Sequence, residues 1–217
     1  MSLIDDTRIE LPRRVLLNQA ATVASGLAIA LYLPGGIAAT DPKAMAPANE
    51  FEPNAWVRIF PDGTVKLVVH KHDSGTGTQT ALAACVAEEL DVNPMTVQVI
   101  TPEDPFFETY IHPVWKVFST GGSTSVSLEY DRLRMAGATA RALLISAAAK
   151  QWKVSPDSCT TEEGRVVHIA NKRSLGYGEL VGVAATLPAP TTVKLKDPAQ
   201  FKYNGKLRHK RDAAAKV

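Results

Sequence analysis

The sequence is poor in cysteine, in aromatic side chains and in net charge. Of its 217 residues, two are cysteines and 6% are aromatic, while 24 basic residues nearly balance 22 acidic ones. Two cysteines are too few for a disulfide scaffold or for a thiolate zinc site. A net charge of +2 gives no global field that would attract nucleic acid or anionic lipid. We therefore expect neither a disulfide-rich module nor a nucleic-acid-binding protein.

Hydrophobic residues are abundant instead. With 45% hydrophobic and 21% charged residues, the composition is that of a globular chain. A chain of this length can bury a core of its own, as one domain or as one domain with a small appendage. Cys85 falls on the apolar face of a predicted helix and is interpreted as a small core residue, so no bridge to Cys159 is expected.

The first 46 residues are predicted to be an export signal and a linker. Arg13 and Arg14 precede a short apolar stretch, residues 23–33, which Pro34 ends. This order is typical of a twin-arginine signal for export to the periplasm, with Ala44-Met45-Ala46 as a cleavage site. The apolar stretch is too short for a confident membrane span. Two alternatives stay open: an amphipathic helix packed on the domain, and an uncleaved signal that tethers the chain to the membrane.

Residues 47–193 are predicted to form one layered α+β domain in the order β-β-α-β-α-β-β-α. It contains two β-hairpins, a single strand and three helices. The expected elements are a hairpin (55–60 and 64–70), a helix (81–90), a strand (96–101), a long helix (124–152), a second hairpin (159–162 and 165–169) and a short helix (177–186). The last segment, 194–217, is charged and lacks periodicity, and it is predicted to be a tail that begins a linker.

Two short loops rich in glycine and hydroxyl groups precede the two longer helices. A helix N-terminus carries unpaired N–H groups and positive partial charge, and both features favour an anion. The first loop is not a P-loop, and Thr80 stands where a dinucleotide fingerprint needs its third glycine. An ordinary capped turn is the alternative interpretation. The candidate cofactor-binding residues are Ser74, Gly75, Thr76, Gly77, Thr78, Thr120, Gly121, Gly122, Ser123 and Thr124.

Other polar residues give weaker signals. His70 and His72 would project to one side of an extended strand, as two metal ligands do, but no third ligand is evident, so no metal site is assigned. Glu88 and Glu89 lie near a helix C-terminus, where they oppose the dipole, and a solvated face is the default interpretation. The aromatic segment 102–120 is long and irregular, which indicates a functional or subunit-packing role. No catalytic residue can be argued from spacing.

Several motifs follow one another in an order that resembles a known family. They are Asn54-Ala55-Trp56-Val57-Arg58-Ile59 with Pro61-Asp62-Gly63, the first glycine loop, Ala87-Glu88-Glu89-Leu90-Asp91-Val92, Thr120-Gly121-Gly122-Ser123-Thr124-Ser125-Val126, Tyr177-Gly178-Glu179-Leu180, and Leu195-Lys196-Asp197-Pro198. As a set they resemble the start of the large molybdenum subunit of the isoquinoline 1-oxidoreductase and membrane-associated aldehyde dehydrogenase family, in the xanthine dehydrogenase/aldehyde oxidase superfamily. The resemblance extends over essentially the whole chain.

This resemblance implies a molybdopterin-binding-domain-like fold. It places Ser74 to Thr78 against the pterin or phosphate-bearing arm of the molybdopterin cofactor, with the second loop nearby. It implies the N-terminal portion of a molybdenum hydroxylase that oxidises aldehydes or N-heteroaromatics. The implied partners are the remainder of the large subunit, a small subunit carrying iron–sulfur clusters, a cytochrome c subunit and a small-molecule substrate.

The sequence departs from the family pattern in two ways. Ser74 and Thr76 replace the methionine and glutamine of the usual Met-Gly-Gln-Gly loop, although Gly-Thr-Gly variants occur in relatives that resemble nicotinate dehydrogenases. Relatives also continue past the point that matches Val217, and their distant region supplies the general-base glutamate. We therefore expect a fragment, a truncated product or one piece of a split subunit, without turnover alone. The alternative is a degenerate exported binding or assembly module.

Overall fold

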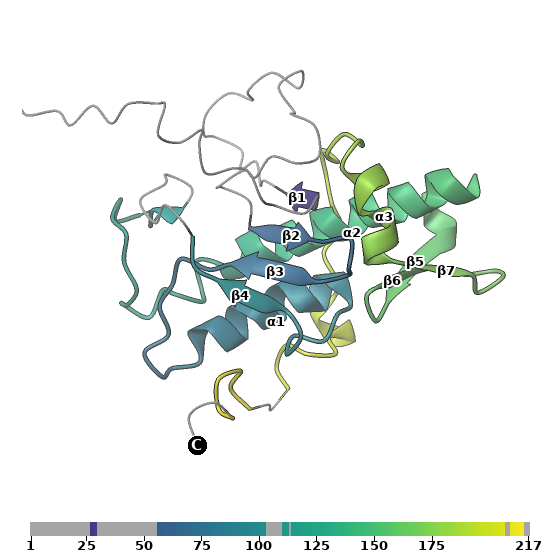
Figure 1. Cartoon of the computed structure of the whole chain (residues 1–217). Coiled ribbons are helices and arrows are strands. Elements are labelled where there is room, and N and C mark those ends of the chain that lie inside the picture. The colour runs from purple at the N-terminus through teal and green to yellow at the C-terminus, as the bar shows by residue number, and fades with distance from the viewer. Residues whose placement is uncertain (1–26, 30–55, 103–109, 113, 207–208, 215–217) are drawn as a thin grey trace, which may run out of the picture.

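The computed structural model describes residues 27–29, 56–102, 110–112, 114–206 and 209–214. These residues form a four-stranded sheet, a three-stranded sheet and three α-helices (Figure 1). The elements are β1 (Leu27–Ile29), β2 (Val57–Ile59), β3 (Val65–Val68), α1 (Thr78–Leu90), β4 (Gln98–Ile100), α2 (Tyr130–Trp152), β5 (Cys159–Glu162), β6 (Arg165–His168), β7 (Ser174–Gly176) and α3 (Tyr177–Ala184). The predicted α+β class is confirmed.

The larger sheet has the strand order β1-β2-β3-β4. Strands β2 and β3 form the predicted hairpin, in which Asp62 Oδ1 accepts a hydrogen bond from Thr64 N at 2.8 Å. Gly63 adopts φ +84°, a conformation that glycine reaches without steric cost. Strand β4 pairs in parallel with β3, and α1 provides the crossover that a parallel pair requires. The sheet therefore presents one face to α1 and α2 (Figure 1).

Strand β1 lies within the segment predicted to be the apolar part of an export signal. It pairs antiparallel with β2, with Leu27 opposite Ile59. The alternative of an N-terminal helix is therefore wrong for these three residues. The arginine pair and the cleavage site lie outside the described residues, and the export signal stays a prediction. Within the described segments, none of the helices combines the length and apolar character needed to cross a bilayer.

Helices α1 and α2 pack closely because small side chains line their contact. A Cβ atom added to Gly137 of α2 would lie 2.9 Å from both Glu89 Cβ and Val86 O of α1. Helix α2 begins at Tyr130, six residues after the predicted start. The preceding residues form turns in which Thr124 N and Thr124 Oγ1 both donate to Gly121 O, a local pairing that competes with helix formation. The prediction that the second glycine loop adjoins a helix N-terminus is therefore wrong.

The second sheet contains the predicted hairpin β5–β6 and one further strand, β7. Strand β7 was not predicted because its three half-buried residues carry no alternating pattern. Helix α3 begins at the predicted residue, and its Tyr177 hydroxyl donates to Leu90 O at 2.5 Å. Gly164 N also donates to Asp91 O at 3.0 Å. The C-terminal end of α1 thereby contacts α3 and the β5–β6 turn.

Residues 194–206, which we call the C-terminal strap, lie along α1. Lys196 N donates to the Glu89 carboxylate, and Lys202 N donates to the Glu88 carboxylate. Both glutamates have 0% exposed surface. The interpretation of Glu88 and Glu89 as a solvated face is therefore wrong, because each receives hydrogen bonds from a segment more than 100 residues away in sequence. The predicted domain limits stay predictions.

Candidate functional site

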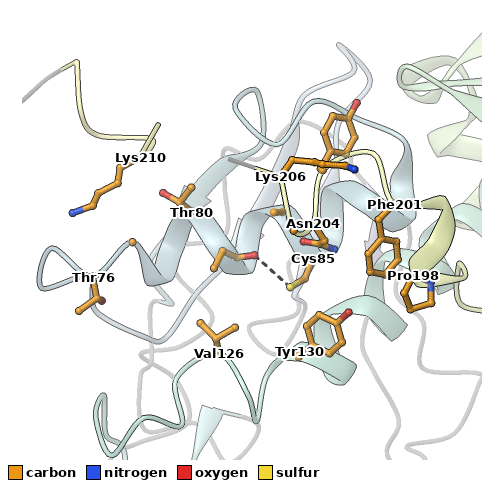
Figure 2. A pocket seen from close by; sticks show the side chains of 15 residues that line it. Thr76, Thr80, Cys85, Val126, Tyr130, Pro198, Phe201, Asn204, Lys206 and Lys210 are labelled. Atoms are coloured by element: carbon orange, nitrogen blue, oxygen red, sulfur yellow. Dashed lines mark hydrogen bonds between the residues drawn. The ribbon is translucent and has the colours of Figure 1, made fainter. Parts of the chain in front are cut away.

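A cavity of about 660 Å³ lies between the start of α1, the start of α2 and the C-terminal strap (Figure 2). Its size is within the range of small-molecule and cofactor sites. Its walls combine hydroxyl, amide and ammonium groups with apolar surface. The lining residues are Thr76, Gly77, Thr80, Ala81, Ala84, Cys85, Val126, Tyr130, Pro198, Phe201, Tyr203, Asn204, Gly205, Lys206 and Lys210.

The cavity has a polar end and an aromatic end. Thr76, Thr80 and Lys210 lie toward one end, whereas Pro198, Phe201 and Tyr130 lie toward the other (Figure 2). Lys210 Nζ donates to Gly75 O, which brings its positive charge to the glycine loop. This division suits a ligand with an anionic group at one end and a flat, less polar group at the other.

Asn204 and Cys85 line the middle of the cavity. Asn204 Nδ2 is buried and has no hydrogen-bond partner among the described residues. Cys85 Sγ donates to Ala81 O at 3.3 Å, and burial raises the pKa of this thiol to about 12. The thiol is therefore protonated at neutral pH and is not a nucleophile. The prediction that Cys85 is a core residue is confirmed, since it is 2% exposed.

The first glycine loop is stabilised by a residue that the sequence prediction did not include. Asp73 Oδ1 accepts hydrogen bonds from Gly75 N at 2.9 Å and from Gly77 N at 3.1 Å, and Asp73 Oδ2 accepts one from Gln79 N at 3.1 Å. Gly75 and Gly77 have φ of +92° and +82°. The Asp73 carboxylate therefore caps α1 from outside the helix. An external anion would meet this loop through its hydroxyl groups rather than through these three N–H groups.

Replacing Asp73 with alanine is expected to lower the free energy of unfolding by about 1–2 kcal/mol, because the first turn of α1 loses its cap. Urea denaturation followed by far-ultraviolet circular dichroism measures the difference. Ser74 is the matched control, since it is exposed and adjacent, and Ser74→Ala is expected to change stability by less than about 0.5 kcal/mol. Equal effects of the two substitutions would contradict the capping role of Asp73.

The second glycine loop begins beside residues 71 and 72, which precede the first glycine loop. Lys71 Nζ donates to Ser119 O at 2.9 Å, and His72 N donates to Thr120 Oγ1 at 3.0 Å. The Trp115 ring covers Gly122 so closely that an added Cβ would lie 2.2 Å from Trp115 Cη2. The beginning of the second loop is therefore bonded to the residues that lead into the first loop.

Only some of the predicted cofactor-binding residues line the cavity. Thr76 and Gly77 line it, whereas Ser74, Gly75, Thr78 and the second-loop candidates, residues 120–124, do not. The assignment of the ten residues to a cofactor stays a prediction.

His70 and His72 do not face the same way. Strand β3 ends at Val68, His70 is 1% exposed, and His72 is exposed. His70 Nε2 lies 3.2 Å from Glu129 Oε1. Burial lowers the pKa of His70, and the nearby Glu129 carboxylate opposes this effect only in part. The expectation that the two histidines project to one side of an extended strand is wrong.

Sequence reasoning missed most of the residues that line the cavity. Lys206 and Lys210 belong to a segment interpreted as a tail, and Tyr130 and Asn204 carry no motif. Thr80 enters the sequence argument only as a departure from a nucleotide fingerprint. The available signal is Asp73, because an Asx residue before a glycine-rich helix start is a capping pattern.

Comparison with known proteins identifies the family. The family described as "Molybdopterin cofactor-binding domain" matches residues 10–215. The chain is 36% identical to the beta chain of isoquinoline 1-oxidoreductase from Brevundimonas diminuta over 178 residues, which is 80% of this chain and 22% of that protein. It is 30% identical to the membrane-bound aldehyde dehydrogenase [pyrroloquinoline-quinone] of Gluconacetobacter polyoxogenes over 131 residues, which is 60% of this chain and 16% of that protein. The chain belongs to the molybdopterin cofactor-binding domain family.

The chain also resembles a dehydrogenase subunit and a solved oxidoreductase structure. The chain is 32% identical to a subunit of nicotinate dehydrogenase from Pseudomonas putida over 133 residues, covering 61% of this chain and 10% of that protein. The crystal structure of quinoline 2-oxidoreductase from Pseudomonas putida 86 superposes on 58% of this chain and 15% of that chain, with a TM-score of 0.46 and 19% identity. The chain therefore spans between a tenth and about a fifth of the length of these curated relatives.

Proposed function

Starting from this family membership, we propose that the cavity receives an anionic part of the molybdopterin cofactor. The chain would then be the N-terminal portion of the large subunit of a molybdenum hydroxylase. The observation that carries this proposal is the cavity itself, whose lining includes Thr76, Thr80, Asn204, Lys206 and Lys210. The proposal moves the predicted cofactor contact from the whole of both glycine loops to the part of the first loop that lines the cavity.

The residues present fit a phosphate-bearing pterin. Lys206 and Lys210 provide positive charge, and the Thr76 and Thr80 hydroxyls provide donors at the beginning of α1, where the helix dipole favours an anion. Asn204 Nδ2 is a buried donor that lacks a partner among the described residues. Phe201 and Tyr130 offer aromatic surface for a flat ring system. These groups would bind and orient the cofactor and exclude water from it.

The bound cofactor would supply the oxidation chemistry, in which a water-derived oxygen is inserted at a carbon atom of an aldehyde or an N-heteroaromatic compound. Electrons would pass to iron–sulfur clusters on a partner subunit, and then to a cytochrome c subunit. Two of the relatives are named as single subunits of larger enzymes, which supports an assembly of more than one chain. Export to the periplasm by the twin-arginine route belongs to the same proposal.

The proposal is tested by replacing both lysines of the cavity. The full chain is produced in a host that makes the cofactor, and bound molybdopterin is measured after oxidation to a fluorescent pterin. The double variant Lys206→Met/Lys210→Met is expected to retain about tenfold less cofactor, because two charge-assisted contacts are lost. Lys150→Met, which removes an exposed charge on α2, is the matched control and is expected to retain the full amount.

Two outcomes would contradict the proposal. One is full cofactor content in the double variant. The other is an unaltered chain that carries no molybdopterin above background, and this result would favour the alternative function, a degenerate exported binding or assembly module. The loop in which Asp73 occupies three N–H groups is the observation consistent with that alternative.

A further inference from the structure

The C-terminal strap forms one wall of the cavity, and a buried carboxylate of α1 holds it there. Phe201, Tyr203, Asn204, Gly205 and Lys206 all line the cavity. The same segment provides three consecutive N–H groups to Glu88: Lys202 N lies 2.7 Å from Oε1, and Tyr203 N and Asn204 N lie 2.7 Å and 2.8 Å from Oε2. The backbone that carries the wall is therefore fixed at three successive positions.

Glu88 and its neighbour Glu89 have different tasks. Glu89 pairs with Arg134 and Arg141 and so connects α1 to α2, and its one strap N–H donor is Lys196 N, at the start of the strap. The Glu88 carboxylate is instead surrounded by strap N–H groups, and its own carbonyl oxygen accepts a hydrogen bond from Lys196 Nζ at 2.6 Å. Successive backbone N–H groups that converge on one anion form a specific anion-binding concavity. Here the anion belongs to the protein.

Burial of a carboxylate is costly unless several donors satisfy it. Both oxygens of Glu88 accept hydrogen bonds, whereas a glutamine would offer one oxygen and turn an NH₂ group toward an N–H donor. The three N–H groups therefore select a carboxylate at this position. Shifting the strap by one residue would replace this set of donors and would move Asn204 and Lys206 away from the cavity.

We propose that Glu88 is a positioning residue for the cavity, because it holds the strap in the register that directs Asn204 and Lys206 toward a bound ligand. The identity of that ligand rests on the proposed function, but the docking of the strap by Glu88 does not. Release of the strap would open the cavity and expose the Cys85 thiol, which is 2% exposed when the strap is docked.

Cys85 therefore provides a direct measurement of strap release. The background is the full chain with Cys159→Ser, in which Cys85 is the one thiol of the sequence. Its reaction with 5,5′-dithiobis(2-nitrobenzoic acid) is compared between this parent and Glu88→Gln. We expect Glu88→Gln to accelerate the reaction roughly 10- to 100-fold, since charge-assisted hydrogen bonds to a buried carboxylate are lost. Asp157→Asn, the same chemical change on an exposed side chain, is expected to leave the rate unchanged.

Hydrogen exchange separates strap release from general unfolding. Amides 202–204 are expected to be protected in the parent chain and to lose that protection in Glu88→Gln, while amides 136–149 of α2 keep theirs. This measurement on the parent chain also tests the proposal if the variant fails to fold. Three results would overturn the positioning role. Amides 202–204 could be unprotected in the parent chain. The Cys85 of Glu88→Gln could react at a rate within twofold of the parent, or Glu88→Gln could lose protection equally in α2.

A ligand measurement distinguishes this inference from the proposed function. Pyrophosphate is the probe, and its binding is followed by protection of Cys85 from the thiol reagent. Glu88→Gln is expected to weaken pyrophosphate protection about tenfold in molecules that remain folded, whereas a purely structural residue would leave it unchanged. If pyrophosphate fails to protect the parent chain, the proposed function is contradicted, and the reaction rates and exchange data still decide whether Glu88 docks the strap.

Discussion

Replacing Glu89 with alanine is expected to lower the free energy of unfolding by about 3–5 kcal/mol, because two arginines would lose their buried counterion. Glu89 Oε1 lies 2.7 Å from Arg134 Nη2, and Glu89 Oε2 lies 2.8 Å from Arg141 Nη1. The glutamate is completely buried, and both arginines are largely buried. Urea denaturation with circular dichroism measures the loss.

Two controls show whether the loss comes from unpaired charge. Asp157→Ala removes an exposed carboxylate and is expected to change stability by less than about 0.5 kcal/mol. The triple variant Glu89→Met/Arg134→Met/Arg141→Met replaces the whole ion cluster with apolar side chains and is expected to recover part of the loss. A stability of Glu89→Ala within about 1 kcal/mol of the parent would contradict the role of Glu89 as the buried counterion.

The second large effect is steric. Gly178→Ala is expected to destabilise the fold by about 3 kcal/mol, at the upper end of the range for overpacking. A Cβ atom on Gly178 would lie 2.1 Å from Pro61 O and 2.8 Å from Gly63 N. These contacts are with backbone atoms of the β2–β3 turn, so α3 or the turn has to move. The melting temperature, recorded by circular dichroism, is the measurement.

Helix α3 contains its own control for this prediction. Gly182 lies in the same helix with nothing within 4 Å of an added Cβ. Gly182→Ala is therefore expected to stabilise the fold by up to about 1 kcal/mol, because alanine favours helix. Opposite signs for the two glycine-to-alanine changes would establish the close approach of α3 to the turn. The same sign for both would refute it.

Local patterns predicted the local elements of this fold. The Pro61-Asp62-Gly63 turn, the β5–β6 hairpin and the beginning of α3 follow from turn chemistry and side-chain periodicity, which act over a few residues. The beginning of α2 was predicted too early, because Thr124 bonds back to Gly121 instead of capping a helix. Periodicity alone does not report such local competition.

The burial of Glu88 and Glu89 and the position of the cavity depend on long-range contacts, which local sequence patterns do not predict. Two adjacent glutamates near the end of a helix are usually solvated, and their burial depends on arginines of α2 and on strap N–H groups more than 100 residues away in sequence. The cavity has the same origin, since its walls come from α1, from the beginning of α2 and from the strap. Thr76 and Gly77 were predictable from loop chemistry, whereas Asn204 and Lys206 depended on the docking of the strap.

The position of the strap has a consequence for how the chain folds during synthesis. Glu88 and Glu89 belong to α1, which is made well before α2, yet their hydrogen-bond partners include residues 196 and 202–204. Until those residues have left the ribosome, the Glu88 carboxylate lacks its three N–H donors and its burial would be uncompensated, whereas Glu89 can already pair with Arg134 and Arg141 of α2. Docking of the strap closes a loop of more than 100 residues, an entropically costly and slow contact. The helix at the centre of this domain therefore completes its packing only after the strap has been synthesised.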